Sequence, residues 1–333
     1  MKTAVVTGSA GFIGARVAER WLSEGWRVVG IDCFSEYYDP RLKRDRARRL
    51  ASHDAYVEIE DRIERPGLLS EVFGTYRPEV VVHLAAQAGV RYSIEAPRSY
   101  LDSNISGTFE LLEAARAHPP AHMLLASTSS VYGANTEMPY AETHKADSQM
   151  SFYAATKKAT EAMAHSYAHL YRLPMTMFRF FTVYGPWGRP DMALFKFVKA
   201  ILEDRPIDVY NHGKMKRDFT FIDDLVEAVD ALAACTPVHA VGEFDSLSPV
   251  APFRIVNIGK SEPDSLGGFI TAIEDALGRS ARRNLMDMQP GDVPATWSDT
   301  RLLAALTGKC PNTPLSVGVP AFVKWYKDYY GVA

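Results

Sequence analysis

The stretch "TAVVTGSAGFIG", residues 3–14, decides the fold. The β-branched run before Gly8 is typical of a short buried strand, and residues 12–25 place apolar side chains at helical spacing before a closing glycine. Three glycines, Gly8, Gly11 and Gly14, lie between the strand and the helix. Such a loop lets the backbone approach a phosphate group and directs the helix N-terminus at it.

Short hydrophobic runs and helical patterns alternate along the first part of the chain. We expect further strands at 26–32, 77–86, 121–130 and 174–185, and helices at 107–118 and 153–172. This alternation predicts an α/β fold with a doubly wound parallel sheet covered by helices on both faces. Ligands of such sheets bind outside the carboxyl ends of the strands. After Tyr184 the sequence changes to polar loops that contain glycine, which predicts a smaller second lobe.

Composition excludes several classes of protein. The chain has 333 residues, of which 47% are hydrophobic and 23% charged, and its net charge of −3 argues against a sequence-independent nucleic-acid binder. Cys33, Cys235 and Cys310 lie far apart, so we expect neither a disulfide framework nor a metal site. No signal-peptide core is present, and no apolar run approaches the ~20 residues that span a membrane. We therefore expect a cytoplasmic protein.

Asp32 closes the second expected strand, 18 residues after Gly14. A carboxylate there is placed to hold the ribose diol of a dinucleotide and would repel a 2′-phosphate, so NAD is favoured over NADP. The alternative for the glycines is a tight turn, and for Asp32 a turn residue. The basic run at 41–50 is either a solvated amphipathic helix or a contact with a cofactor or substrate phosphate.

The fourth expected strand runs into small residues, and Ala85 and Ala86 would let a cofactor pass close by. Asn104 is a candidate polar support for this end of the sheet, or a helix cap.

Tyr153 and Lys157 are four residues apart in an alanine-rich helical pattern, so both side chains leave the same face. A fixed ammonium and a nearby nicotinamide cation would each lower the pKa of the phenol. The expected strand at 121–130 ends in hydroxyls, among them Thr128. Beside a dinucleotide loop, this set indicates a tyrosine that moves protons while hydride leaves the same carbon for the cofactor. On its own, the tyrosine–lysine pair is common on solvated helices.

These motifs, namely "TGSAGFIG", "HLAAQAGV", "SSVYG", "YAATKKA" and "RFFTVYGP", resemble the extended short-chain dehydrogenase/reductase superfamily over the full length of the chain. Within it the chain looks most like the UDP-glucuronate 4-epimerases, through "GIDCFSEYYDPRLKRDR", "RFFTVYGPWGRPDMALFKF", "IDVYNHGKMKRDFTFIDD" and "MQPGDVPATWSD". The resemblance implies a Rossmann-type domain, a tightly held NAD, and UDP-glucuronate and UDP-galacturonate as the two substrates.

The resemblance also implies roles for individual residues. It assigns catalysis to Thr128, Tyr153 and Lys157. With the motifs above, it assigns NAD binding to Gly8, Gly11, Phe12, Ile13, Gly14, Asp32, Asp61, Leu84, Ala85, Ala86, Asn104, Tyr153 and Lys157. It assigns the UDP-sugar to Arg91, Ser129, Ser130, Thr182, Arg189, Ala193, Leu194, Phe195, Val209, Tyr210, Arg217, Gln289 and Asp292.

Two stretches depart from the usual pattern. Relatives usually carry a Gly-Asp pair after the third strand, where this chain has "VEIEDRIERP", so Asp61 is an inexact match. Many relatives carry a second phosphate arginine near the C-terminus, where "MQPGDV" offers Gln289 and Asp292. Arg91 is one candidate to neutralise the second phosphate.

The expected domains are 1–182 for NAD, with a return of the chain around 216–258, and 183–333 mainly for the UDP-sugar. A homodimer through the helices near 100–117 and 153–172 is expected from the superfamily. Alternatives are a UDP-glucuronate decarboxylase, another NAD-dependent sugar-nucleotide epimerase, a 4,6-dehydratase, and a non-catalytic NAD-dependent scaffold. The dehydratase would normally need an acid–base pair where this chain has Thr128, Ser129 and Ser130.

A 4-keto uronate is a β-keto acid, which loses carbon dioxide once its breaking bond aligns with the carbonyl π-system. An epimerase must prevent that alignment. We expect the hydroxyls of 127–130 and Thr182 to hold the carboxylate near the ketone plane, with Arg189 shaping that part of the site.

Overall fold

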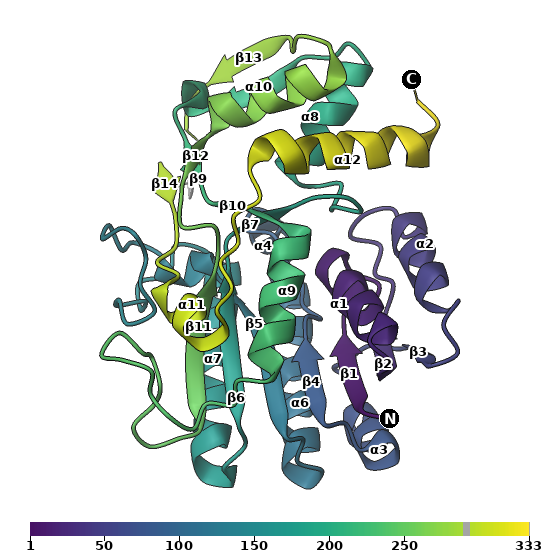
Figure 1. Cartoon of the computed structure of the whole chain (residues 1–333), viewed down its shortest axis with the longest axis vertical. Coiled ribbons are helices and arrows are strands. Elements are labelled where there is room, and N and C mark those ends of the chain that lie inside the picture. The colour runs from purple at the N-terminus through teal and green to yellow at the C-terminus, as the bar shows by residue number, and fades with distance from the viewer. Residues whose placement is uncertain (289–293, 333) are drawn as a thin grey trace.

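A seven-stranded parallel sheet forms the centre of the computed structural model, which describes residues 1–288 and 294–332 (Figure 1). The strand order is β11-β6-β5-β4-β1-β2-β3. The strands are β1 (Thr3–Thr7), β2 (Arg27–Asp32), β3 (Tyr56–Glu60), β4 (Val80–His83), β5 (His122–Thr128), β6 (Met175–Phe180) and β11 (Phe253–Ile258). The order reverses between β1 and β4, and this switch point is where a doubly wound sheet binds its ligand. The predicted α/β fold is confirmed.

Helices cover both faces of the sheet, because successive strand residues point to opposite sides. In β1, Ala4 and Val6 pack into one buried cluster, and Val5 packs into the other. The first face carries α1 (Phe12–Ser23), α2 (Arg41–Leu50), α9 (Ile222–Ala233) and α11 (Arg301–Thr307); the second carries α3 (Leu68–Tyr76), α6 (Gly107–Ala117) and α7 (Phe152–Tyr171). Shorter helical elements are α4 (Tyr92–Glu95), α5 (Pro97–Tyr100), the π-helix η1 (Leu101–Ser106), and the 3₁₀ turns η2 (Ser129–Tyr132) and η3 (Asn211–Gly213).

A second, smaller set of elements lies beyond the carboxyl ends of the strands (Figure 1). It contains α8 (Ala193–Leu202), α10 (Leu266–Leu277) and α12 (Leu315–Tyr330) with three small sheets. These sheets pair β7 (Thr182–Tyr184) with β10 (Phe219–Phe221), β9 (Lys216–Arg217) with β12 (Asp264–Ser265) and β14 (Ala295–Thr296), and β8 (Ile207–Tyr210) with β13 (Arg283–Met286). The division at residue 182 stays a prediction.

Three expected strands are shorter than predicted. The run at 77–86 was expected to be one strand, but β4 covers only Val80–His83. The run at 174–185 was expected to be one strand, but the chain leaves the main sheet after Phe180, and Thr182 donates its amide to the carbonyl of Asp218 at 3.0 Å. Phe181 lies at the break, buried in a separate cluster with Tyr132 and Tyr140. The run at 121–130 ends at Thr128, whose Oγ1 accepts from the amide of Ser130 at 3.2 Å and so caps the 3₁₀ turn that follows.

Within residues 1–288 and 294–332, every helix is too short or too polar to cross a bilayer.

Candidate active site

A cavity of about 300 Å³ opens at the carboxyl ends of the central strands. Residues predicted for NAD and residues predicted for catalysis line it together: Gly8, Gly11, Phe12, Ile13, Gly14, Asp32, Asp61, Leu84, Ala85, Ala86, Thr128, Tyr153 and Lys157. They come from the ends of β1, β2, β3, β4 and β5 and from the starts of α1 and α7. Elements far apart in sequence therefore converge on one site.

The glycine loop fits a dinucleotide. Gly8 has a φ of +72°, and a Cβ there would lie 2.8 Å from the amide nitrogen of Ala85. A Cβ on Gly14 would lie 2.1 Å from the carbonyl oxygen of Gly8. Gly11 caps α1, and no side chain in the described chain bonds to this helix start. The first-turn amides of α1 therefore face the cavity and can receive a pyrophosphate.

Asp32 lies at the cavity wall with a side chain that braces the glycine loop. Its Oδ2 accepts from the amide of Ala10 at 3.1 Å and its Oδ1 from the amide of Phe34 at 2.8 Å. Each carboxylate oxygen has two lone pairs, so both oxygens keep acceptor capacity for a ribose diol. Lys43 of α2 also lines the cavity and donates to the carbonyl and hydroxyl of Ser35 at 3.0 and 2.7 Å.

The basic run at 41–50 contains both buried and solvent-accessible charged residues. It forms α2, as the amphipathic reading expected, but Lys43 and Arg46 are buried. Arg46 donates to the carbonyls of Ala10 at 3.1 Å and Trp187 at 2.6 Å, so it ties the glycine loop to the loop after β7. The sequence analysis did not single out either residue. Their three-residue spacing, which places them on one face of the helix, was the available signal.

Tyr153 and Lys157 face the cavity from the first two turns of α7, which begins at the cap Ser151. Lys157 is 4% exposed and donates to the carbonyl of Ala126 at 2.9 Å. Burial lowers the pKa of Lys157 to about 8, although the charge of Glu161 acts to raise it.

The pKa of Tyr153 is raised, contrary to the expected depression. Burial is the main cause, and the hydrogen bond with Thr128 and the charge of Arg189 act in the opposite direction. Thr128 and Tyr153 therefore line the same part of the cavity. The expectation also included a nicotinamide cation, which is not part of the protein chain.

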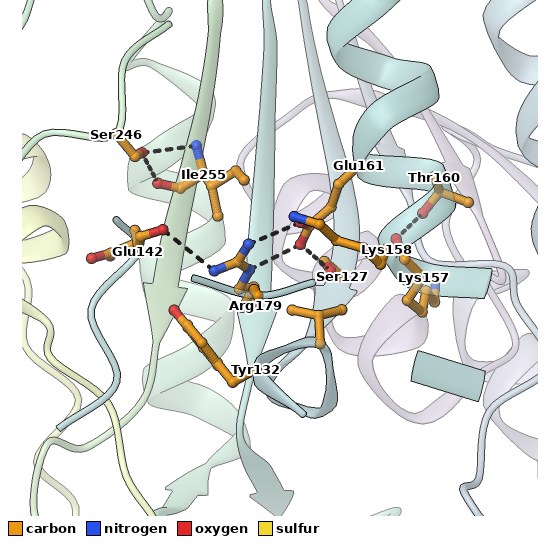
Figure 2. Close-up of polar contacts among 12 residues, drawn as sticks. Ser127, Tyr132, Glu142, Lys157, Lys158, Thr160, Glu161, Arg179, Ser246 and Ile255 are labelled. Atoms are coloured by element: carbon orange, nitrogen blue, oxygen red, sulfur yellow. Dashed lines mark hydrogen bonds and ion pairs between the residues drawn. The ribbon is translucent and has the colours of Figure 1, made fainter. Parts of the chain in front are cut away.

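A buried ion pair between Glu161 and Arg179 begins one helical turn beyond Lys157 (Figure 2). Glu161, one turn beyond Lys157, accepts from Arg179 of β6 at 2.9 and 2.8 Å, and its Oε1 accepts from the hydroxyl of Ser127 at 2.6 Å. Both charged side chains are almost fully buried. Lys157 and Glu161 thus hold consecutive residues at the end of β5, and Thr128 follows them. The four-residue spacing after Lys157 was the signal that sequence reasoning missed.

Asn104 lies behind the cavity wall in the π-helix η1. Its Oδ1 accepts from the amide of Gln87 at 2.8 Å, and its Nδ2 donates to the carbonyl of Gln87 at 3.1 Å and to the hydroxyl of Thr156 at 3.0 Å. The side chain joins the loop after β4 to α7. It supports the end of the sheet rather than capping a helix.

The residues predicted for the sugar nucleotide occupy several places. Arg189 lines the main cavity and also a smaller adjoining pocket, which Thr182, Ala193, Leu194 and Phe195 line as well. Ser129 and Ser130 lie in the turn η2, beside Thr128 but not in the cavity lining. Val209 and Tyr210 end β8, the guanidinium of Arg91 lies 5.0 Å from the Tyr210 ring, and Arg217 lies in β9. Gln289 and Asp292 lie outside the described residues.

The model of the NAD dependent epimerase/dehydratase family matches residues 4–241. The chain belongs to this family. Family membership confirms the expectation of NAD, and the glycine loop, Asp32 and the cavity suit that cofactor.

Individual relatives match the chain almost from end to end. A probable UDP-glucuronate 4-epimerase of Rhizobium meliloti is 51% identical over 98% of this chain and 97% of its own length. UDP-glucuronate 4-epimerase 6 of Arabidopsis thaliana is 44% identical over 98% of this chain and 72% of its own length. The crystal structure of UDP-glucuronic acid 4-epimerase from Bacillus cereus with UDP-glucuronic acid and NAD superimposes with a TM-score of 0.88 at 32% identity, over 99% of this chain and 100% of that one.

Proposed function

We propose that the chain is a UDP-glucuronate 4-epimerase that interconverts UDP-glucuronate and UDP-galacturonate through a transient 4-keto sugar. The observation that carries the proposal is the convergence of Thr128, Tyr153 and Lys157 on the cavity that the glycine loop also lines. The names of the full-length relatives support the choice of substrate.

Tyr153 is the acid–base group in this proposal. Its phenol oxygen takes the proton from the hydroxyl on sugar carbon 4 and later returns it, while Thr128 orients that hydroxyl. When bound, NAD supplies the hydride acceptor and a positive charge next to the phenol. Lys157 lines the same cavity, keeps a second positive charge there and would hold the cofactor ribose. The raised pKa of Tyr153 in the protein alone makes proton abstraction depend on these charges.

The sugar carboxylate must be retained. Thr182 and Arg189 line the pocket that adjoins the catalytic cavity, and Ser129 and Ser130 follow Thr128. Hydrogen bonds from this group would hold the carboxylate near the ketone plane and oppose its loss as carbon dioxide. The same fold with a carboxylate free to turn would be a UDP-glucuronate decarboxylase, which is the second candidate.

The remaining parts of the proposal concern binding. Arg217 and Arg91 are assigned to the diphosphate. Ala193, Leu194, Phe195, Val209 and Tyr210 are assigned to the uracil and ribose, and Gln289 and Asp292 stay predictions from the sequence. The NAD domain is 1–182 with a return around 216–258, and 183–333 mainly binds the UDP-sugar.

A homodimer is part of the proposal. Phe109 of α6 and Leu170 and Tyr171 of α7 are exposed large apolar residues on the two helices that the superfamily pairs across a two-fold axis. A solution mass of one chain by light scattering would contradict the dimer.

Product analysis tests the proposed activity. The protein is incubated with UDP-glucuronate and catalytic NAD, and the sugar nucleotides are separated. A second hexuronate with its carboxylate intact is expected. A UDP-pentose with release of carbon dioxide would replace the proposal with the decarboxylase.

A further inference from the structure

Arg189 lies at the junction of the catalytic cavity and the pocket beside it. It follows β7, precedes α8, and lines both the catalytic cavity and the adjoining pocket. Tyr153 lines the same cavity, and the charge of Arg189 opposes the rise in the pKa of its phenol. Under the proposed function, the sugar carboxylate and carbon 4 lie in the same region. The direction in which this guanidinium points therefore bears on the fate of the carboxylate.

Asp191 holds that guanidinium in a two-point contact. Arg189 donates from Nε to Oδ1 at 3.0 Å and from Nη2 to Oδ2 at 2.5 Å, which fixes the guanidinium plane. Burial is the largest single influence and acts to raise the pKa of Asp191, but the charge of Arg189 and the hydrogen bonds from Arg189 and Tyr37 together lower it. The carboxylate is not a helix cap, because Met192 is the first flanking residue of α8 and no side chain within the described ranges caps that helix.

Tyr37, in the segment between β2 and α2, holds Asp191 from the cofactor side. Its hydroxyl donates to Oδ2 of Asp191 at 3.2 Å, and its ring lies 5.9 Å from the guanidinium carbon of Arg189. The ring also packs on Tyr92 at 4.7 Å. Burial raises the pKa of Tyr37 to about 12, so the hydroxyl stays a donor at neutral pH. Two segments 154 residues apart thus fix one side chain of the site.

We propose that Asp191, oriented by Tyr37, is a positioning residue that sets product specificity by fixing Arg189 against the sugar carboxylate. The inference rests on the proposed function. With Arg189 fixed, the carboxylate cannot turn into line with the ketone π-system. With Arg189 loose, it can: the C5–C6 bond breaks, its electron pair forms a C4–C5 double bond, the carbonyl π pair moves to O4, and carbon dioxide leaves. A proton from water then adds at C5 and gives a 4-keto pentose.

The test is the ratio of pentose to galacturonate formed from UDP-glucuronate, with thermal unfolding as the check on folding. Asp191→Asn is expected to raise the pentose fraction on the order of tenfold, below the ~100-fold that a 1 Å misplacement can cause. Asp191→Glu, which keeps the charge, is expected to restore most of the natural ratio. Tyr37→Phe, which leaves the ion pair, is expected to give a smaller rise in the same direction.

A double-variant cycle separates positioning through Arg189 from an independent effect. If Asp191 acts through Arg189, adding Asp191→Asn to Arg189→Gln leaves the pentose fraction of Arg189→Gln unchanged. An additive increase would overturn the inference, as would an unchanged ratio or complete loss of turnover in a folded Asp191→Asn protein. If that variant does not fold, Tyr37→Phe decides in the same way. Failure of the natural protein to make galacturonate would instead refute the proposed function.

Discussion

At Tyr153, burial and charge act against each other. Burial raises the pKa of the phenol, whereas Thr128 and Arg189 favour its ionised form. We predict that Tyr153→Phe lowers kcat by ~10²–10⁴-fold, the usual contribution of a positioned acid–base group, while UDP affinity stays unchanged. The matched control is Tyr167→Phe on the same helix, whose hydroxyl donates to Glu113 at 2.6 Å outside the cavity lining. Equal losses in both variants, measured by steady-state kinetics, would contradict the role of Tyr153.

Positions set by local spacing could be predicted from the sequence, whereas side-chain contacts between distant loops could not. Gly8, Gly14 and Asp32 sit at the spacings that a strand–loop–helix unit imposes, so local pattern was enough to predict their place. The contact between Tyr37 and Asp191 joins two loops that only the folded chain brings together. A single sequence holds no signal for such a contact.

Helix α7 acts as one element that carries both the catalytic pair and its support. Residues 153, 157 and 161 share one face, and Glu161 is bonded to Arg179 and Ser127 (Figure 2). We predict that Glu161→Gln lowers the free energy of unfolding by about 3–5 kcal/mol, because it leaves a buried guanidinium without its counter-charge. Urea unfolding followed by circular dichroism measures this value.

The control for Glu161 removes both charges. Glu161→Gln combined with Arg179→Met is expected to regain most of the lost stability, since an uncharged buried pair has no unpaired ion. A double variant as unstable as the single one would show that shape, not charge pairing, holds these elements together.

Predicted strand boundaries were wrong where tertiary contacts, rather than the local sequence pattern, determine where a strand ends. Residues 175–184 are mostly hydrophobic, aromatic or β-branched and contain neither glycine nor proline, so one strand was expected there. The buried position of Phe181 and the hydrogen bond from the amide of Thr182 to the carbonyl of Asp218 divide the run between two sheets. That division turns Thr182 toward the pocket beside Arg189.

Across the whole molecule, Glu142 joins a loop, the sheet edge and the C-terminal segment. Its Oε1 accepts from the amide of Asn257 in β11 at 2.8 Å, its carbonyl accepts from Arg179 at 3.5 Å, and Asn257 donates to the carbonyl of Asp299 at 3.3 Å. Burial raises the pKa of Glu142 from 4.5 to about 7. Between these two pH values Glu142 is ionised in the unfolded chain but still protonated in the folded one. The free energy of unfolding therefore falls as pH rises, and this loss is complete above pH 7.

We predict that Glu142→Gln, which keeps an oxygen acceptor, removes this loss of stability at high pH. The gain in unfolding free energy is at most about 3 kcal/mol above pH 7 and vanishes near pH 4.5. Urea unfolding at both pH values measures it. An equal effect at the two pH values would mean that ionisation of Glu142 is not the cause.

The most direct test of the whole account uses UDP-glucuronate that carries deuterium on carbon 4, with the product read by NMR. Hydride transfer to a held cofactor and back predicts UDP-galacturonate with carbon 4 inverted, the carboxylate intact and the deuterium still on carbon 4. Product that has exchanged the deuterium for solvent hydrogen, or a pentose with release of carbon dioxide, would contradict the central claim.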